Sequence, residues 1–348
     1  MHGSKPEITV ITLASLTTMG SHLGVVYLVR DVSDLEKLLE EVSPRFTGKV
    51  PVKIHMGEPG NKYFLRPNEI EPVLKFIREN RGRPFLFDTV VLYRSPRSSV
   101  SGYMEVAKRH GFSEICDVVI DEEGVPVEVE GLRIEVCKTI ATNSQMVVIS
   151  HCKGHAMSGY GGAIKNLGMG GVTKETKRLL HEGAMPRRVE ELCNYCGICA
   201  QVCPENAINV QEGQWVWDRE KCFGCGKCVE NCPEGALDYS LRNFLEALAI
   251  SAKACLLGMR KVLYLNYLLR ISKLCDCSSS PRNEIICGDI GILASEDIVS
   301  IEKASLDLIY EKGGEGLFER VHRVDPLRQI EYAEKIGLGS MDYELIEI

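Results

Sequence analysis

Two runs of four cysteines near the middle of the chain constrain its fold more than any other feature. The first run is Cys193, Cys196, Cys199 and Cys203, and the second is Cys222, Cys225, Cys228 and Cys232. Both have the spacing C-x2-C-x2-C-x3-C-P, so the second run is an internal repeat of the first. Helical periodicity disappears between residues 186 and 240, which predicts that this stretch is an inserted module.

The spacing of these cysteines indicates the metal group that they bind. Four thiolates per site select either zinc or an iron–sulfur cluster. Zinc ribbons use paired C-x2-C units, whereas three cysteines at x2 intervals followed by x3-C-P are typical of bacterial ferredoxins. We therefore expect two [4Fe-4S] clusters in a ferredoxin-like module, rather than two zinc sites or eight structural thiols.

The repeat also predicts which cysteines share a cluster. In ferredoxins with two such runs, the fourth cysteine of each run binds the cluster of the other run. One cluster is expected to take Cys193, Cys196, Cys199 and Cys232. The other is expected to take Cys222, Cys225, Cys228 and Cys203.

Outside the module, short β-rich runs alternate with helical patterns, which favours an α/β body with a mixed or parallel sheet and flanking helices. Strands are expected at 8–11, 50–55, 85–87, 147–149, 262–269 and 288–294. Helices are expected near 34–42, 68–80, 98–110 and 241–257, with another capped by 295–297 and running to about 310. The body would then comprise residues 1–185 and 241–348, with the module at 186–240 between its two parts.

Composition limits the classes of function. The chain of 348 residues has 41 Lys and Arg against 48 Asp and Glu, a net charge of −7, which argues against a nucleic-acid partner. Charges interrupt the most apolar region, 244–274, so we expect no membrane span. The chain has fifteen cysteines but is long enough to fold without disulfides, and residues 1–7 contain no apolar stretch of signal-peptide type. We therefore expect a reducing, cytoplasmic location.

A glycine-rich segment follows the strand expected at 147–149. It begins with His151-Cys152-Lys153-Gly154-His155 and continues through 158–171, which includes Lys165 and Asn166. The segment matches neither the dinucleotide-binding fingerprint nor a P-loop. Two explanations remain open: backbone N–H groups with Lys153 and Lys165 cradle an anion, or the glycines allow tight packing against the cysteine-rich module.

The segment Cys275-Asp276-Cys277 differs from the remaining cysteines, most of which we expect to be small buried hydrophobes. It places two thiols and a carboxylate after a predicted strand, where ligands bind in open α/β sheets. With His151, Cys152 or His155, it would form a third metal site or a redox-active thiol pair. The alternative is two solvent-facing thiols on a turn.

Polar residues that follow predicted strands suggest a polar rim around one mouth. They are His55, Glu58, Asn61, Asp88, Thr89, Arg94, Asp289 and Asp297. At this mouth we assign catalytic or substrate-contacting roles to His151, Lys153, His155, Lys165, Asn166 and Asp276. The metal ligands are expected to be Cys275, Cys277 and Cys152.

Together these motifs resemble the iron–sulfur branch of the family called domain of unknown function 362. The resemblance is carried by residues 150–155, 161–170, both cysteine runs, 275–277 and 289–295, and it extends to 55–61 and 87–89. It implies two [4Fe-4S] clusters on an α/β body, in anaerobic or thermophilic prokaryotes, with no settled reaction. Cys152 departs from the pattern, since an aromatic residue is expected there, and this leaves room for an extra ligand.

The body is far larger than a frame for two clusters requires, so we expect it to bind a small-molecule substrate or a partner. The leading hypothesis is an iron–sulfur oxidoreductase of unknown substrate, which transfers electrons between a ferredoxin-like donor and a substrate or metal site on the body. A second hypothesis is a metal-binding or metallocofactor maturation factor that uses Cys and His ligands without turnover. A third treats the clusters as structural staples.

Overall fold

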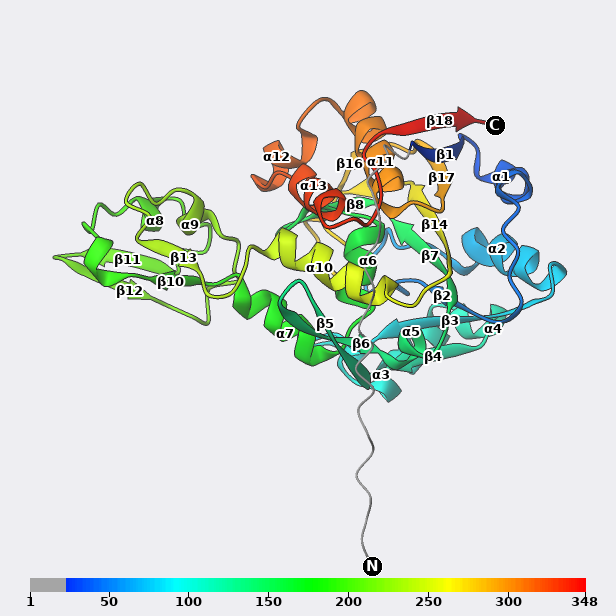
Figure 1. Cartoon of the computed structure of the whole chain (residues 1–348), viewed down its shortest axis with the longest axis horizontal. Helices are drawn as coiled ribbons and strands as arrows, with labels where there is room; N and C mark the ends of the chain where they lie inside the picture. The colour runs from blue at the N-terminus through cyan, green and yellow to red at the C-terminus, as the bar shows by residue number, and fades with distance from the viewer. Residues whose placement is uncertain (1–22) are drawn as a thin grey trace, which may run out of the picture.

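An eight-stranded sheet forms the centre of the α/β body in the computed structural model, which describes residues 23–348 (Figure 1). The strands are β1 (Gly24–Val29), β2 (Gly48–Lys53), β3 (Gly82–Thr89), β4 (Val118–Asp121), β7 (Gln145–His151), β14 (Lys261–Leu268), β17 (Gly291–Ser295) and β18 (Tyr343–Glu347). Their order is β18-β1-β17-β14-β7-β2-β3-β4, and β17 runs antiparallel to both of its neighbours while every other pair is parallel. The sheet is therefore mixed and mostly parallel.

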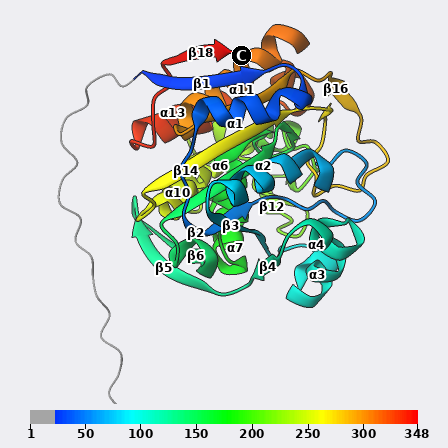
Figure 2. The same ribbon diagram turned by 90° about the vertical axis from the view of Figure 1, so that its right-hand side faces the viewer.

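Helices cover both faces of this sheet, which gives three layers. One face carries α1 (Leu35–Val42), α2 (Pro67–Glu79), α3 (Val100–Arg109) and α4 (Phe112–Ile115). The other carries α6 (Ala163–Gly170), α10 (Phe244–Leu256), α11 (Ile298–Gly313) and α13 (Leu327–Lys335). Figure 2 shows α1 and α2 in front of the sheet.

Each face has its own hydrophobic core because side chains alternate along a strand. In β7, Val147 and Ile149 belong to the core beneath α1 and α2, whereas Met146 and Val148 belong to the core beneath α6 and α10. All four side chains are almost fully buried. The continuous apolar run at 146–149 is thus explained by burial on both faces.

Smaller elements connect the main ones. They are η1 (Val32–Asp34), η2 (Pro96–Ser98), β5 (Gly124–Val129), β6 (Leu132–Cys137), α5 (Lys138–Ala141), β8 (Lys153–His155), β9 (Gly159–Gly161), α7 (Lys174–Gly183), β15 (Ile271–Ser272), β16 (Ile285–Cys287) and α12 (Leu317–His322). Among the described residues, no helix is long and apolar enough to cross a membrane.

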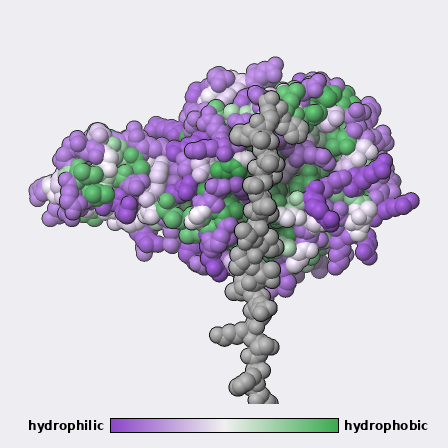
Figure 3. All heavy atoms as spheres, viewed as in Figure 1, coloured by the Kyte–Doolittle hydropathy of each residue, from purple (hydrophilic) through white to green (hydrophobic). Residues whose placement is uncertain are grey.

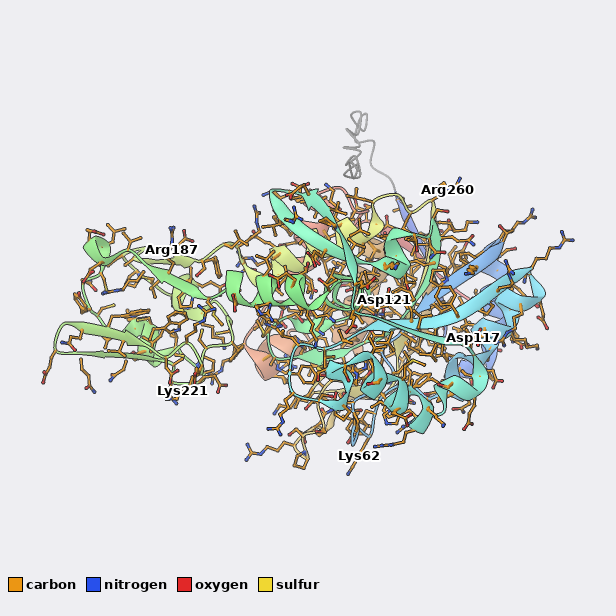
Figure 4. All side chains as sticks on the ribbon, turned by 90° about the horizontal axis from the view of Figure 1, so that it is seen from below. Lys62, Asp117, Asp121, Arg187, Lys221 and Arg260 are labelled. Atoms are coloured by element: carbon orange, nitrogen blue, oxygen red, sulfur yellow. A yellow bond between two sulfur atoms is a disulfide. The ribbon has the colours of Figure 1, made fainter. Side chains whose placement is uncertain are left out.

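Residues 186–240, the cysteine-rich lobe, project from one side of the body (Figure 1). The lobe contains β10 (Pro186–Arg188), η3 (Glu190–Leu192), α8 (Ile198–Gln201), β11 (Ile208–Gln211), β12 (Gln214–Trp217), α9 (Lys227–Glu230) and β13 (Leu237–Tyr239). β10 pairs with β13, so the chain enters and leaves the lobe through one two-stranded ladder. Figure 4 shows Arg187 and Lys221 on opposite sides of it.

The sequence repeat in the lobe is also a structural repeat. Gly197 and Gly226 both have φ of 78° and directly precede α8 and α9, a left-handed conformation that suits glycine. The backbone N–H groups of Ala207 and Ala236 each donate to the sulfur of the last cysteine in their run, both at 3.2 Å. The two runs therefore have matching local geometry.

Ion pairs and backbone hydrogen bonds attach the lobe to the body. Arg328 of α13 contacts Glu230 of the lobe at 2.9 Å and Glu246 of α10 at 3.1 Å. The N–H groups of Ser240 and Leu241 donate to the carbonyls of Met185 and Gly183. Apolar residues interrupt the hydrophilic surface of the lobe in Figure 3, and the side chain of Val216 is exposed there.

The described residues contain the helices and strands expected between 34 and 310, with small shifts of their ends. The strand expected at 288–294 begins only at Gly291, because residues 285–287 pair separately with β15. The strand expected at 8–11 lies outside the described residues. The larger elements that the sequence did not predict are β1, β4, α6, α7, α13 and β18, since their apolar patterns are short or, in α6, interrupted by glycines.

Candidate functional site

A cavity of about 160 Å³ lies at the carboxyl edge of the parallel strands β2, β3 and β7. Lys53 at the end of β2, Asp88 of β3 and His151 of β7 line it. Helices α6 and α7 and the turn at 275–277 contribute the remaining walls. Ligands of open α/β sheets bind at this edge, so the cavity is the candidate site.

Eight of the nine site residues predicted outside the lobe line this cavity. They are His151, Lys153, His155, Lys165, Asn166, Cys275, Asp276 and Cys277. The two segments that the sequence placed at strand ends, 151–166 and 275–277, therefore meet at one mouth.

Cys152 is the exception among the predicted residues. Its side chain belongs to the core beneath α6, and its sulfur accepts a hydrogen bond from the Tyr160 hydroxyl at 3.2 Å. Because side chains alternate along a strand, a residue between His151 and Lys153 faces away from the cavity that they line. Burial raises the pKa of the Cys152 thiol and keeps it protonated. The structure thus does not bring Cys152 to the site as an extra ligand.

Asp276 is the central anion of one wall of the cavity. Its carboxylate lies 3.0 Å from Nδ1 of His151 and also accepts a hydrogen bond from the Lys153 ammonium. Burial alone would raise the pKa of Asp276, but its contacts with His151 and Lys153 hold it well below its ordinary value. Nε2 of His151 is 2.6 Å from the Leu269 carbonyl, so both ring nitrogens are engaged and the ring anchors the turn.

A second segment, 58–61, holds the same turn from the other side. The N–H of Glu58 donates to the Asp276 carbonyl at 2.9 Å. The amide nitrogen of Asn61 donates to the Ser278 carbonyl at 2.7 Å and to the Cys275 carbonyl at 3.4 Å. Asn61 therefore positions the cysteine turn rather than a ligand. Of the other expected rim residues, Arg94 and Asp289 are exposed outside the cavity, and Asp297 caps α11.

The two cysteines of the turn face the cavity together with His155. Cys275 and Cys277 form a disulfide, and their sulfurs and a ring nitrogen of His155 all lie within 4.8 Å of one another. Burial and the nearby Lys165 hold the pKa of His155 well below 6.5, so its ring is neutral at pH 7. Neutral imidazole is the form that binds metals, and thiolates are available once the disulfide is reduced. These residues make a possible Cys/His metal site.

Three of the cations that line the cavity have carboxylate partners. Lys53 lies 2.9 Å from Asp88, and Arg97 lies 3.2 Å from Glu58. The third is Lys153, which pairs with Asp276 as described above. The side-chain oxygen of Asn166 also accepts from Lys53, at 2.8 Å, so this predicted site residue positions a lysine.

The other two cations, Lys165 and Lys177, lack such partners among residues 23–348. Lys177 donates to the neutral oxygens of Thr89 and Val90, and burial lowers its pKa to about 7. The ammonium of Lys165 makes no ion pair or hydrogen bond within the same residues. Burial, followed by the charge of Lys153, lowers the pKa of Lys165 to about 8.

The glycines of the 158–171 segment have two different uses. A Cβ on Gly161 would lie 2.7 Å from Cδ of Lys165, and one on Gly170 would lie 2.5 Å from Nζ of Lys53. These two glycines leave space for lysine side chains at the cavity. By contrast, a Cβ on Gly168 would come 2.4 Å from the Leu248 carbonyl of α10. The tight packing is thus made against α10 of the body, and not against the cysteine-rich module as expected.

Four basic residues of the cavity were not predicted from the sequence: Lys53, Arg97, Lys177 and His181. Lys53 lies within the strand expected at 50–55 and ends the observed strand β2, so the earlier strand end concealed its place at the cavity. Lys177 and His181 are four residues apart and share one face of α7, but that helix was not predicted. Arg97 follows a loop, and nothing in its neighbourhood signals burial.

The cysteines of the lobe gather in two groups of four. Cys193, Cys196, Cys199 and Cys232 line one small pocket, together with Trp215. The second group is Cys203, Cys222, Cys225 and Cys228. In it, burial raises the pKa of Cys228 to about 12, and the three other thiols add to this shift. Each group therefore contains three cysteines of one run and the last cysteine of the other.

The lobe touches a helix that lines the cavity. Gly224, between Cys222 and Cys225, lies so close to the His181 carbonyl that a Cβ there would be 2.7 Å from this oxygen. His181 itself lines the cavity, and burial lowers its pKa to about 4. The C-terminal end of α7 thus separates the second cysteine group from the cavity.

These features define a class of α/β protein with a cysteine-rich lobe and a Cys/His group in a cavity at the carboxyl edge of its sheet. The chain belongs to the family described as Domain of unknown function (DUF362), which matches residues 50–307. That range includes the lobe and every residue of the cavity described above.

Comparisons with individual proteins do not narrow the assignment beyond this family. No curated protein matches the chain. Among solved structures, the lactate racemase apoprotein from Thermoanaerobacterium thermosaccharolyticum is similar, with 12% identity and a TM-score of 0.37 over 71% of this chain and 51% of that one. A structural-genomics protein from Thermotoga maritima has 9% identity and a TM-score of 0.39 over 87% of this chain and 58% of that one. The chain thus spans little more than half the length of either protein, and neither likeness assigns an activity.

Proposed function

We propose that this protein is an iron–sulfur redox protein that transfers electrons between a ferredoxin-like donor and a substrate or metal at the cavity. The observation that carries the proposal is the pocket shared by Cys193, Cys196, Cys199 and Cys232. The fourth of these comes from the second run, and such crossed sharing is typical of ferredoxins with two [4Fe-4S] clusters. Zinc ribbons, in contrast, use paired C-x2-C units.

The residues present suit two such clusters. One would be held by the pocket group, and the other by Cys203, Cys222, Cys225 and Cys228. The N–H groups of Ala207 and Ala236, which donate to Cys203 and Cys232, would help to set the potentials. When bound, the clusters supply single electrons at potentials of about −700 to +450 mV, depending on hydrogen bonding and exposure.

Electrons would enter the body where Gly224 lies against His181. This contact supports the proposal because His181 also lines the cavity, so one residue separates the lobe from the site. Substituting Gly224 would push the lobe away from α7, since its φ of 77° also disfavours a side chain. The close approach at this position therefore serves electron transfer as well as packing.

The Cys275–Cys277 disulfide is the proposed redox group of the cavity. Its reduction breaks the S–S bond, takes up two electrons and two protons, and leaves two thiols. A ferredoxin-like donor supplies the electrons one at a time, and the protons come from solvent or from ammonium groups at the cavity. A substrate that accepts two electrons and two protons restores the disulfide.

A second candidate function is favoured by the proximity of His155 to the two sulfurs. With the disulfide reduced, His155, Cys275 and Cys277 offer one nitrogen and two thiolates, a ligand set that suits zinc, nickel or other borderline metals. The protein would then bind a metal and hand it on without turnover. Metal transfer in the absence of electron flow would distinguish this function from the first.

A reducing, cytoplasmic setting belongs to the same proposal, because oxygen and oxidants attack exposed clusters. The carboxylates and amines on the lobe surface would meet a small redox partner, and no nucleic acid is involved.

The experiment uses anaerobically purified protein with a reduced ferredoxin as donor. Thiols at positions 275 and 277 are counted by alkylation and mass spectrometry before and after reduction. The double variant Cys275→Ser with Cys277→Ser should keep the visible absorption and paramagnetic resonance of both clusters yet take up two fewer electrons per chain. The matched control is Cys116→Ser, which removes a buried thiol that does not line the cavity.

Three results would contradict the proposal. Zinc in place of iron in the lobe would exclude the clusters. Loss of the clusters in the double variant would make the cysteine turn structural. Equal electron uptake by the double variant and the native protein would exclude the disulfide as acceptor.

A further inference from the structure

The charges that line the cavity do not balance. Five side chains are cationic and two are anionic: Lys53, Arg97, Lys153, Lys165 and Lys177 against Asp88 and Asp276. Glu58, which does not line the cavity, forms an ion pair with Arg97. Among these cations, Lys165 has neither an ion pair nor a hydrogen bond within residues 23–348.

The Lys165 side chain is partly buried at the cavity wall, where its ammonium is less well hydrated than on an open surface, and such a cation is stabilised by a counter-ion. The chain leaves space for the Lys165 side chain at the cavity, because a Cβ at position 161 would clash with it and Gly161 has none. Burial and the charge of Lys153 lower the pKa of Lys165 to about 8, so most of it remains charged at pH 7. An anion that enters the cavity would therefore supply the counter-ion that residues 23–348 do not provide.

Asp276, the anion whose charge acts on Lys165, is already paired with Lys153, and Glu302 is engaged elsewhere as well. Glu302 of α11 accepts the N–H of Ala163, the first residue of α6, and the amide of Asn266. Its carboxylate is fully buried in the core and does not line the cavity. Glu302 thus occupies the N-terminus of α6, and neither that terminus nor Glu302 serves the Lys165 ammonium.

We propose that the cavity binds a small substrate through a carboxylate or phosphate group that contacts the ammonium of Lys165. The bound group supplies the charge that the cavity lacks. Because the 275–277 turn lines the same cavity, the rest of the molecule lies beside the disulfide. That the bound molecule is a substrate rests on the proposed function, whereas its binding to the cavity requires no electron transfer.

The test is titration calorimetry of the anaerobic protein with inorganic phosphate and with succinate, at constant ionic strength set by chloride. Both the native protein and Lys49→Met should bind at least one of the two anions. Lys49 is the matched control, since it lies on β2 at the opposite, exposed end of the strand from Lys53. Lys165→Met should bind at least tenfold more weakly, and Lys165→Arg should keep the affinity within a few-fold.

Each outcome decides something. Binding of phosphate alone identifies a phosphorylated substrate, and binding of succinate alone identifies a carboxylate. No binding of either anion, or equal binding by Lys165→Met and native protein, overturns the inference. If Lys165→Met fails to fold, Gly161→Ala takes its place, because its Cβ displaces the Lys165 side chain; unchanged affinity there also overturns the inference.

The same samples separate this inference from the proposed function. Anion binding without reduction of the Cys275–Cys277 disulfide contradicts the redox proposal alone. Reduction of the disulfide without any anion binding contradicts the present inference alone.

Discussion

The carboxylate of Asp276 lies 3.0 Å from Nδ1 of His151, although the two residues are 125 positions apart in the sequence. This contact joins the end of β7 to the cysteine turn. Lys153 binds the same carboxylate, so two positively charged or polar groups of one segment hold one anion of the other. The position of the disulfide in the cavity therefore depends on this buried carboxylate as well as on the hydrogen bonds of segment 58–61.

Replacing Asp276 by Asn should destabilise the protein by about 3–5 kcal/mol, because it leaves the buried Lys153 without its counter-charge. The free energy of unfolding from denaturant titration measures this. Asp117→Asn, at an exposed position, should change it by no more than about 0.5 kcal/mol. An Asp276→Asn protein as stable as the native one would show that the ion pair does not hold the turn.

Crossed ligation in the lobe can be tested by pairing substitutions. Cys203→Ser should lower the iron content from about eight to about four atoms per chain, since one of two four-iron clusters is lost. Adding Cys222→Ser should cost no further iron, whereas adding Cys193→Ser should remove the rest. The opposite pattern would mean that each run holds its own cluster, and Cys116→Ser should leave the iron content unchanged.

Glu302 should make stability fall as the pH rises. Burial raises its folded-state pKa to about 7, against 4.5 for the free side chain. The folded protein therefore retains a proton that the unfolded chain loses, so this stabilisation is complete below pH 4.5 and is lost as the pH rises to about 7. The loss amounts to about 3 kcal/mol at 1.36 kcal/mol per pKa unit.

Glu302→Gln should remove this dependence, because an amide does not titrate. The measurement is the free energy of unfolding at pH 5 and pH 8 for both proteins. The exposed Glu315→Gln serves as control and should keep the native slope. An equal slope in Glu302→Gln would place the pH dependence in another group.

The glycines of the 158–171 segment should separate packing from binding. Gly168→Ala meets the backbone carbonyl of Leu248 at 2.4 Å and should cost about 1–3 kcal/mol, as overpacking of a core does. Gly161→Ala meets only the flexible Lys165 side chain and should mainly weaken phosphate binding. Gly288→Ala is the control and should change neither stability nor phosphate binding, since its Cβ would lie 3.8 Å from the nearest atom, Cε of Lys312. A Gly168→Ala protein as stable as the native one would contradict the packing role.

Much of the candidate site could be predicted from the sequence because parallel strands place their carboxyl ends together. That rule brought His151 and Asp276 to one mouth before any contact was known. It failed for Cys152, since the rule locates the strand end but alternation decides which residues face the cavity. Reading residues 151–153 as a strand would have corrected this.

The parts that the sequence did not predict depend on burial and tertiary contact. Lys177 and His181 look like solvated helix residues until α7 is packed against the sheet. Arg97 is buried beside Glu58 and Asp88 by a fold that a local pattern does not encode. The many glycines predicted that the backbone of this segment approaches other groups closely. Only the structure shows that Gly161 and Gly170 leave space for the side chains of Lys165 and Lys53.

The ladder between β10 and β13 has a consequence for the history of this architecture. Pro186 is the register partner of Tyr239, so the two ends of the inserted segment are already neighbours in space. A short hairpin could replace everything between them without rerouting the chain or disturbing the sheet. The lobe is thus a cassette, which one insertion or deletion at the ladder would add or remove while the path of the chain through the body stayed the same.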